Sequence, residues 1–195
     1  ASSIEPHTKR SLAAPTEATI YLLMTIIHFQ RLEDYENARK CLKPCLFLVR
    51  KMKNELCEIA LWIDALLKIK EGLPDQALQS VEKAIEVHNK SARKESRCLG
   101  AFYYLLASIH NQTGNLEKSF ENILKSISQY NESHEDYGTE SESPLEEALK
   151  ILIEEVKPKI FEVYLFLIEL FVKKKEFGQA IKSIEEGFQH ISSTH

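Results

Sequence analysis

Apolar residues recur at spacings of three and four along nearly the whole chain, as in ATIYLLMTIIHF (18–29) and EVYLFLIELF (162–171). Such spacing places apolar side chains on one face of a helix. With only 6 Gly and 6 Pro in 195 residues, the chain favours long helices over many short strands. Helices are predicted near 16–31, 34–53, 55–71, 74–90, 95–113, 115–130, 144–157, 159–175 and 177–192. Pro44, inside the second of these, predicts a kink there or a split into two helices.

Four segments repeat one arrangement, in which a turn is followed by a small residue and by a second small residue seven positions later. The pairs are Ala38/Cys45, Ala77/Ala84, Ser119/Ser126 and Ala180/Gly187. The apolar helix before each turn carries near its middle Ile26, Ala65, Ala107 and Ile168, respectively. Small side chains let two helix backbones approach closely, so each segment predicts an antiparallel helical hairpin. Gly72 and Gly114 are expected to cap helix ends, and Pro74 to open the following helix.

This arrangement resembles the tetratricopeptide repeat (TPR) family, whose turns are similar to LEDYENA, GLPDQA, GNLEKS and KEFGQA in this chain. The first small residues of successive segments lie 39, 42 and 61 residues apart, whereas the family repeats every 34. The proline that usually closes the second helix is also missing. The resemblance implies an all-α, right-handed superhelical solenoid of antiparallel hairpins, with about four repeats and one inserted helix. A different helical-hairpin solenoid is the alternative.

The expected organisation has four parts. They are a flexible lead-in (1–15), three TPR-like hairpins (16–130), an acidic loop (131–143), and an inserted amphipathic helix with the last hairpin (144–192). The lead-in is compatible with a fragment of a longer protein.

The predicted helix at 144–157 interrupts the repeat and accounts for its longest spacing. Ser143 as N-cap, Pro144 at the first position and Glu146 three residues after the cap form a capping box. One face is apolar and is formed by Leu145, Ala148, Leu149, Leu152, Ile153 and Val156. Three interpretations are open: the helix packs in sequence as part of an irregular hairpin, folds back over the concave face as a plug, or binds a partner or a second copy.

In the TPR family, the first helix of each hairpin lines a concave face that holds peptides or partner helices. The positions that the resemblance carries over are Leu23, Ile27, Arg31, Trp62, Leu66, Ile69, Tyr104, Ser108, Gln112, Leu165, Phe166 and Glu169. Most are apolar, so the Lys/Asn clamp for a terminal carboxylate found in chaperone-binding members is not expected. Either these residues are ordinary core, or they form a groove for an apolar helix with Trp62 and Tyr104 as its strongest anchors.

The charged residues indicate which kinds of partner the protein could bind, and one serine is a candidate for modification. A net charge of −4 argues against a general nucleic-acid binder. Two basic clusters are expected to be solvated surface or a patch for an acidic protein segment: Arg39, Lys40, Lys43, Arg50, Lys51 and Lys53, and Lys90, Arg93, Lys94 and Arg97. Ser143, before a proline and after the acidic loop, is a candidate phosphorylation site.

No sequence motif points to catalysis. A phosphate-binding Gly-rich loop, HExxH and GxSxG are all missing from the sequence. The four cysteines contain no CxxC pair, so free thiols in a reducing compartment are expected, with no metal and no cofactor. No apolar run is long enough for a bilayer. The expected location is cytoplasmic or nuclear.

The sequence therefore predicts a non-enzymatic scaffold or adaptor that binds an apolar or amphipathic segment of a partner protein in a concave groove. The alternative is a structural assembly module that self-associates or belongs to a larger complex. Neither hypothesis involves a membrane or a small-molecule substrate, and neither favours nucleic acid as a partner.

Overall fold

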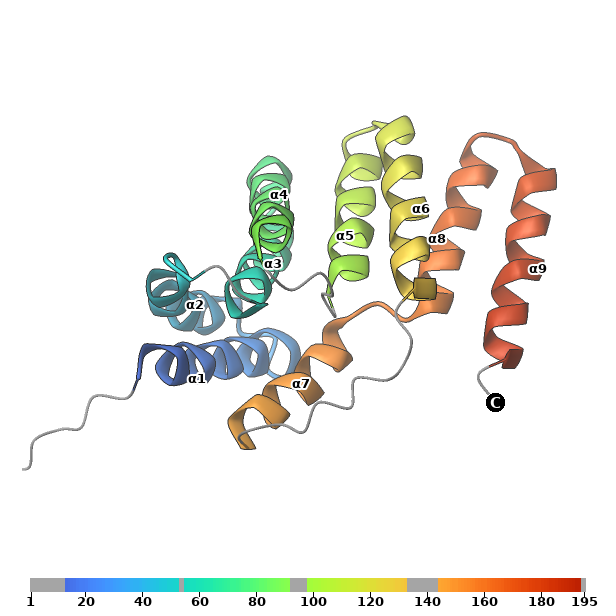
Figure 1. Cartoon of the computed structure of the whole chain (residues 1–195). Coiled ribbons are helices and arrows are strands. Elements are labelled where there is room, and N and C mark those ends of the chain that lie inside the picture. Colours follow the sequence, from blue (N-terminus) through green and yellow to red (C-terminus); the bar gives the residue numbers. More distant parts are fainter. Residues whose placement is uncertain (1–12, 53–54, 92–97, 133–143, 194–195) are drawn as a thin grey trace, which may run out of the picture.

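The computed structural model describes residues 13–52, 55–91, 98–132 and 144–193, and this part of the chain is built from helices (Figure 1). They are α1 (Ala14–Ile26), which continues into a π turn (Ile27–Arg31), α2 (Tyr35–Val49), α3 (Glu55–Lys70), α4 (Pro74–Lys90), α5 (Leu99–Gln112), α6 (Leu116–Glu132), α7 (Pro144–Val156), α8 (Ile160–Lys173) and α9 (Phe177–Ser193).

Eight of these helices form four hairpins that stack in chain order: α1 with α2, α3 with α4, α5 with α6, and α8 with α9. Neighbouring hairpins pack through α2 and α3, α4 and α5, and α6 and α8 (Figure 1). The predicted all-α solenoid of four hairpins with one inserted helix is confirmed. The right-handedness of its superhelix stays a prediction.

The eight small residues of the repeat are all buried at the contacts within hairpins. Three of them also donate hydrogen bonds to carbonyl oxygens of the facing helix. Ser126 Oγ lies 2.7 Å from the Gly100 oxygen, and Ser119 Oγ lies 2.8 Å from the Ala107 oxygen. Cys45 Sγ lies 3.4 Å from the Ala18 oxygen. The helices approach closely at these positions, as the sequence pattern predicts.

The predicted glycine caps are confirmed by backbone geometry. Gly72 has a φ of +74° and Gly114 a φ of +79°. After Gly72, the amide of Leu73 donates to the carbonyl of Lys68 at 2.9 Å, as in a Schellman motif. Lys175 has a φ of +62° at the corresponding position of the turn between α8 and α9. There the amide of Glu176 donates to the carbonyl of Phe171 at 2.9 Å.

Several helix limits differ from the prediction. α2 runs unbroken through Pro44, so of the two outcomes predicted for Pro44, a kink or a split, the split does not occur, and the helix ends at Val49 rather than 53. α5 begins at Leu99 rather than 95. Predictions outside the described residues concern Ser143 and its cap, most of the lead-in and acidic loop, Lys53, and the basic residues 93, 94 and 97.

The inserted helix α7 packs mainly against α1, and not against its neighbours in sequence (Figure 1). Leu149 and Ile153 are buried in the core cluster that α1 to α5 form. Arg31, in the π turn after α1, donates to both carboxylate oxygens of Glu155 at 2.7 Å. The hypothesis that this helix packs in sequence is therefore wrong, because its apolar stripe completes the core of the first hairpin.

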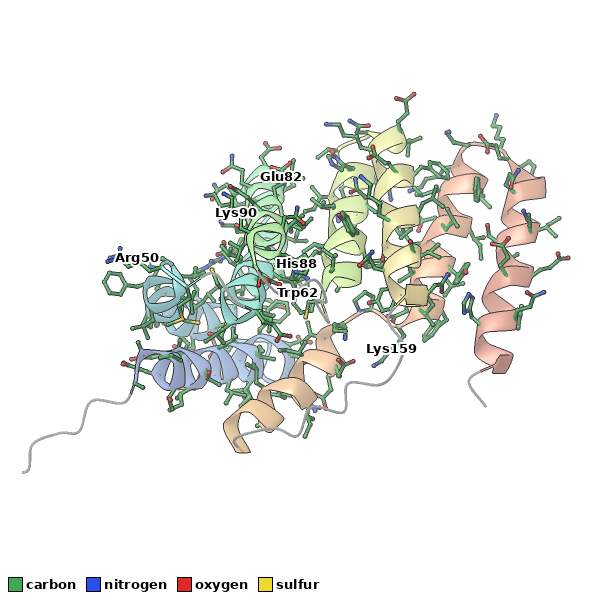
Figure 2. All side chains as sticks on the ribbon, viewed as in Figure 1. Arg50, Trp62, Glu82, His88, Lys90 and Lys159 are labelled. Atoms are coloured by element: carbon green, nitrogen blue, oxygen red, sulfur yellow. The ribbon has the colours of Figure 1, made fainter. Side chains whose placement is uncertain are left out.

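A buried ionic network joins α2, α3 and α4. Asp64 is buried and binds Arg39, Lys68 Nζ at 2.7 Å and Ser80 Oγ at 2.7 Å. Arg39 also donates to both carboxylate oxygens of Glu71, at 3.0 and 2.8 Å. Arg39 was predicted to belong to a solvated basic cluster, but it lies instead at this interface between hairpins (Figure 2 shows the side chains along the stack).

Candidate functional site

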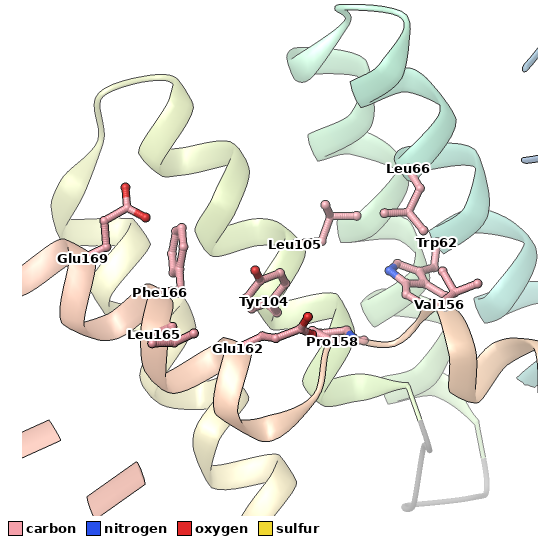
Figure 3. A pocket seen from close by; sticks show the side chains of 11 residues that line it. Trp62, Leu66, Tyr104, Leu105, Val156, Pro158, Glu162, Leu165, Phe166 and Glu169 are labelled. Atoms are coloured by element: carbon pink, nitrogen blue, oxygen red, sulfur yellow. The ribbon is translucent and has the colours of Figure 1, made fainter. Parts of the chain in front are cut away.

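A cavity of about 450 Å³ opens between α3, α5, α8 and the linker that joins α7 to α8 (Figure 3). The three helices are the first helices of their hairpins, which the TPR resemblance predicts to line the concave face. The cavity is lined by Trp62, Leu66, Ala101, Tyr104, Leu105, Val156, Pro158, Glu162, Leu165, Phe166 and Glu169. We call this site the concave pocket.

The concave pocket brings together half of the predicted groove residues. Those that line it are Trp62, Leu66, Tyr104, Leu165, Phe166 and Glu169. Those that lie outside it are Leu23, Ile27, Arg31, Ile69, Ser108 and Gln112. Three of the latter belong to α1 and its π turn, where α7 packs. The inserted helix α7 thus packs on the first hairpin, and the pocket lies between the first helices of the three later hairpins.

Trp62 differs from the prediction of an accessible anchor. Its side chain is only 1% exposed and packs on Phe102, with ring centroids 6.1 Å apart. Trp62 therefore belongs to the core and forms the floor of the pocket. Its Nε1 is buried without a hydrogen-bond partner among the described residues. Figure 3 shows this nitrogen on the side of the ring that faces Tyr104 and Pro158.

Tyr104 and Phe166 are the aromatic residues that a ligand would meet first. Both are half-buried, and their rings lie 5.6 Å apart at 60°. This tilted contact joins α5 to α8 and holds the two walls of the pocket together.

The rim of the pocket carries carboxylates. Glu162 and Glu169 are both exposed, and neither Lys nor Arg lines the cavity. Burial, together with these two carboxylates, raises the pKa of Tyr104 above its ordinary value. Glu162 also accepts the backbone N–H of Lys159 at 2.7 Å, and Glu169 binds Lys173 Nζ at 2.7 Å. The rim therefore favours a cationic group beside the apolar interior.

The end of α7 and the linker after it close one end of the pocket through Val156 and Pro158, respectively. The carbonyl of Pro158 accepts the hydroxyl hydrogen of Tyr130 at 2.7 Å, which fixes the linker to α6. The residues Ala101, Leu105, Val156, Pro158 and Glu162 were not predicted to line a pocket. The one sequence signal at this end of the pocket was Pro158 itself, two residues before the first residue of α8.

The described residues hold little reactive chemistry. They contain no group of three or more His, Cys, Asp or Glu placed to hold a metal ion. The four cysteines, all within this part of the chain, form no disulfide, and burial raises the pKa of both Cys45 and Cys98 to about 12. Such thiols stay protonated and unreactive at neutral pH. Along the described ranges, no helix has both the length and the apolar character needed to span a membrane.

Comparison with known proteins agrees with the hairpin geometry. The tetratricopeptide repeat model matches residues 101–132, which form most of α5 and all of α6. The crystal structure of BtubC (BKLC) from P. vanneervenii is similar over 96% of this chain and 68% of that chain, with a TM-score of 0.73 and 11% identity. The chain is TPR-like.

A second structure, a crystal structure of a Podosopora anserina putative kinesin light chain with nearly identical TPR-like repeats, is also similar. The similarity covers 94% of this TPR-like chain and 99% of that chain, with a TM-score of 0.55 and 14% identity. At these identities the likeness concerns the fold alone. A comparison with curated proteins gave no match. TPR repeats generally mediate protein–protein interaction and are generally not catalytic.

Proposed function

We propose that this TPR-like chain is a non-enzymatic adaptor that captures an apolar or amphipathic segment of a partner protein in the concave pocket. The observation that carries the proposal is the pocket itself. It is a cavity between the first helices of three hairpins, lined mainly by apolar side chains and with a size in the range of ligand-binding pockets.

The composition of the pocket defines the segment that it fits. Leu66, Tyr104 and Phe166 offer apolar walls for one or two side chains of the partner. Because the linker closes one end, the segment inserts side chains into the pocket rather than running through an open groove. Glu162 and Glu169 at the rim then favour a Lys or Arg next to the inserted residue, since opposite charges at an interface orient the partner and exclude acidic competitors.

Two adjacent tyrosines on α5 allow a matched test. Tyr104 lines the pocket, whereas Tyr103 does not and lies below Lys125, 5.8 Å from its Nζ. Both side chains are half-buried. Tyr104→Ala should weaken partner binding by about 2 kcal/mol, or roughly 30-fold, as expected for an aromatic contact at the centre of an interface. Tyr103→Ala should leave it unchanged.

The measurement is quantitative affinity purification with the wild type and both variants, after thermal unfolding has shown that both variants fold. Proteins that bind the wild type and Tyr103→Ala but not Tyr104→Ala are pocket partners. Their affinity is then measured by calorimetry with the purified proteins. Equal losses in the two variants, or none in either, would contradict the proposal.

Self-association is a second candidate function. It is favoured by an apolar surface on α8 and α9 that lies away from the stacked hairpins. It does not require the concave pocket, so the two candidates can fail separately. A cytoplasmic or nuclear location also stays a prediction.

A further inference from the structure

The outer surface of α2 carries a row of cations around one phenylalanine. Of the first predicted basic cluster, Arg39 belongs to the ionic network and Lys53 lies outside the described residues. The other members of this cluster are exposed, and so is a phenylalanine between them. We call these residues the basic stripe: Lys40, Lys43, Phe47, Arg50 and Lys51. Figure 2 shows Arg50 at the outer edge of the stack, where its side chain points away from the other hairpins.

The basic stripe lies on one side of α2, opposite to the side that is buried. At 100° per residue, its first four side chains fall within about 80° of the helix circumference. Arg50 keeps helical φ and ψ after the end of α2, and Lys51 follows it in the turn. The buried residues of the helix lie about half a turn away: Ala38, Leu42, Cys45 and Val49. From Lys40 to Arg50 the stripe is about 15 Å long, at 1.5 Å per residue.

The positive charges of the stripe are largely unmatched by carboxylates. Lys40 Nζ lies 2.7 Å from Oε1 of Glu36, one turn earlier. Lys43, Arg50 and Lys51 form no ion pair within the part of the chain that the structure describes. On α4, α6 and α8, by contrast, a lysine binds the glutamate four residues before it. The stripe thus carries positive charge that the described chain does not neutralise.

The helix dipole accounts for only part of this row of cations. Cations near the C-terminal end of a helix interact favourably with the dipole, but the effect falls off within the last turn. Arg50 and Lys51 follow directly after the end of α2 and suit this role. Lys40 and Lys43 lie more than one turn before that end, so the dipole gives no reason for their positions.

Phe47 lies at the centre of the stripe and is 61% exposed. Residues three and four positions away are neighbours on a helix surface, and for Phe47 these include Lys43, Arg50 and Lys51. Cζ of Arg50 lies over the phenyl ring, 4.1 Å from its centroid. This cation–π contact holds the two side chains together. A partner would therefore meet an apolar ring that has cations towards both ends of the helix.

Among the second helices of the first three hairpins, the positive surface is confined to α2. α4 exposes three carboxylates and two lysines, and the described side chains of α6 expose two of each. Nucleic acids and anionic membranes bind broad positive surfaces, because their own charges are spread over long distances. A stripe that is one helix wide and about 15 Å long fits a short peptide segment instead.

We propose that the basic stripe binds a short acidic segment of a partner protein, with one aromatic or aliphatic residue between its carboxylates. The carboxylates pair with Lys43, Arg50 and Lys51, and the apolar residue packs on the exposed side of Phe47. The stripe belongs to a second helix, whereas first helices line the concave pocket. The inference is therefore independent of partner capture in the pocket, and either can fail without the other.

Fluorescence anisotropy tests the proposal with a labelled probe, a short peptide of Glu and Asp with one Phe at its centre. Measurements at roughly 50 mM salt keep the screening of charges weak. Lys43→Glu should weaken binding at least about tenfold, because it places a carboxylate beside those of the peptide. The matched control is Lys83→Glu, the same change of charge on the exposed surface of α4, which should change the affinity less than about twofold.

The apolar contact is tested by a double-mutant cycle. Phe47→Ala should weaken binding of the peptide roughly tenfold, as expected for an aromatic contact at the centre of an interface. A second peptide, with Ala in place of Phe, should bind equally weakly to the wild type and to Phe47→Ala. Phe188→Ala serves as the control, since Phe188 of α9 is exposed to a similar degree, 65%, and should have no effect.

The outcomes that contradict the proposal are distinct. Equal weakening by Lys43→Glu and Lys83→Glu, or no binding of the peptide at low salt, would show that the stripe is an ordinary solvated surface. Tighter binding of a DNA duplex or of phosphatidylserine vesicles than of the peptide, at the same salt, would make the stripe a site for phosphate groups instead. Equal affinity for the two peptides would exclude a role of Phe47 and overturn recognition of a mixed acidic and apolar segment.

Discussion

At the scale of single residues, the turn between α8 and α9 differs from the two turns that Gly72 and Gly114 close. Gly72 and Gly114 adopt positive φ, but Lys175 does so with a full side chain. The left-handed conformation costs a residue with a Cβ roughly 1–2 kcal/mol, and a glycine avoids this cost. Glycine also loses more conformational freedom on folding, which cancels about half of the gain. Lys175→Gly should therefore raise the free energy of unfolding by about 1 kcal/mol. Urea unfolding measures it, and Lys174→Gly, at a residue with negative φ, should be destabilising instead.

At Gly100 the packing leaves no room for a side chain. A Cβ there would lie 2.8 Å from Cε2 of Tyr130, and the Tyr130 hydroxyl is held by Pro158. Gly100→Ala should thus destabilise the fold by about 1–3 kcal/mol through overpacking. Gly178, at the start of α9, has open space around it. Gly178→Ala should be neutral or slightly stabilising. Thermal unfolding of the two variants and the wild type measures both effects. A neutral Gly100→Ala would show that the Tyr130 ring can shift.

At the scale of the elements, the ionic network of Asp64 makes the contact between α2, α3 and α4 dependent on pH. Burial alone would raise the pKa of Asp64, but hydrogen bonds from Lys68, Ser80 and Arg39 and the charge of Lys68 lower it below its ordinary value. A carboxyl with a lowered pKa stabilises the folded state fully above its unfolded pKa of about 4, and this contribution is lost as the pH falls through the folded value.

Asp64→Asn should accordingly cost about 3 kcal/mol at pH 7, because Arg39 and Lys68 lose their shared buried carboxylate. The cost should shrink as the pH falls below about 4 and then through the lowered pKa of the folded wild type, where Asp64 becomes protonated. Urea unfolding at a series of pH values measures both effects. Glu86→Gln removes the partner of Lys90 on an exposed helix surface and serves as the control with little change. A constant cost for Asp64→Asn at all pH values would contradict the role of its charge.

The helix pairs could be predicted because small residues carry information about close approach. Ala77 and Ser119 each mark where one helix meets its partner, and Gly72 and Gly114 mark where the chain turns. These are local signals, separated by a few residues. The sequence left open whether α2 is kinked or split at Pro44, because the outcome depends on packing of the whole helix against α1 and α3, which outweighs one missing backbone hydrogen bond.

At the scale of the whole molecule, the long-range contacts were harder to predict. The stripe with Leu149 and Ile153 required burial, but an apolar stripe does not specify what covers it. Its partner, α1, lies more than a hundred residues earlier in the sequence. For the same reason, the sequence left open whether Trp62 is a core residue or an accessible anchor, because the Phe102 ring that packs on it comes from α5. Half of the predicted groove residues line the pocket. Val156 and Pro158 could be assigned to the pocket only once the position of α7 was known.

This placement of α7 makes the first and last parts of the chain depend on each other. Ile153 is buried against the first core, whereas Ile151, on the same helix, is 54% exposed. Ile153→Asp should remove the cover of α1 and cost about 3 kcal/mol or more, since a carboxylate would be buried without a partner. Hydrogen exchange should then accelerate in α1 and α2, far from the substitution in sequence, and Ile151→Asp should leave it unchanged. Faster exchange confined to α7 would mean that the first hairpin is stable without this helix, and that packing of α7 on α1 does not stabilise α1 and α2.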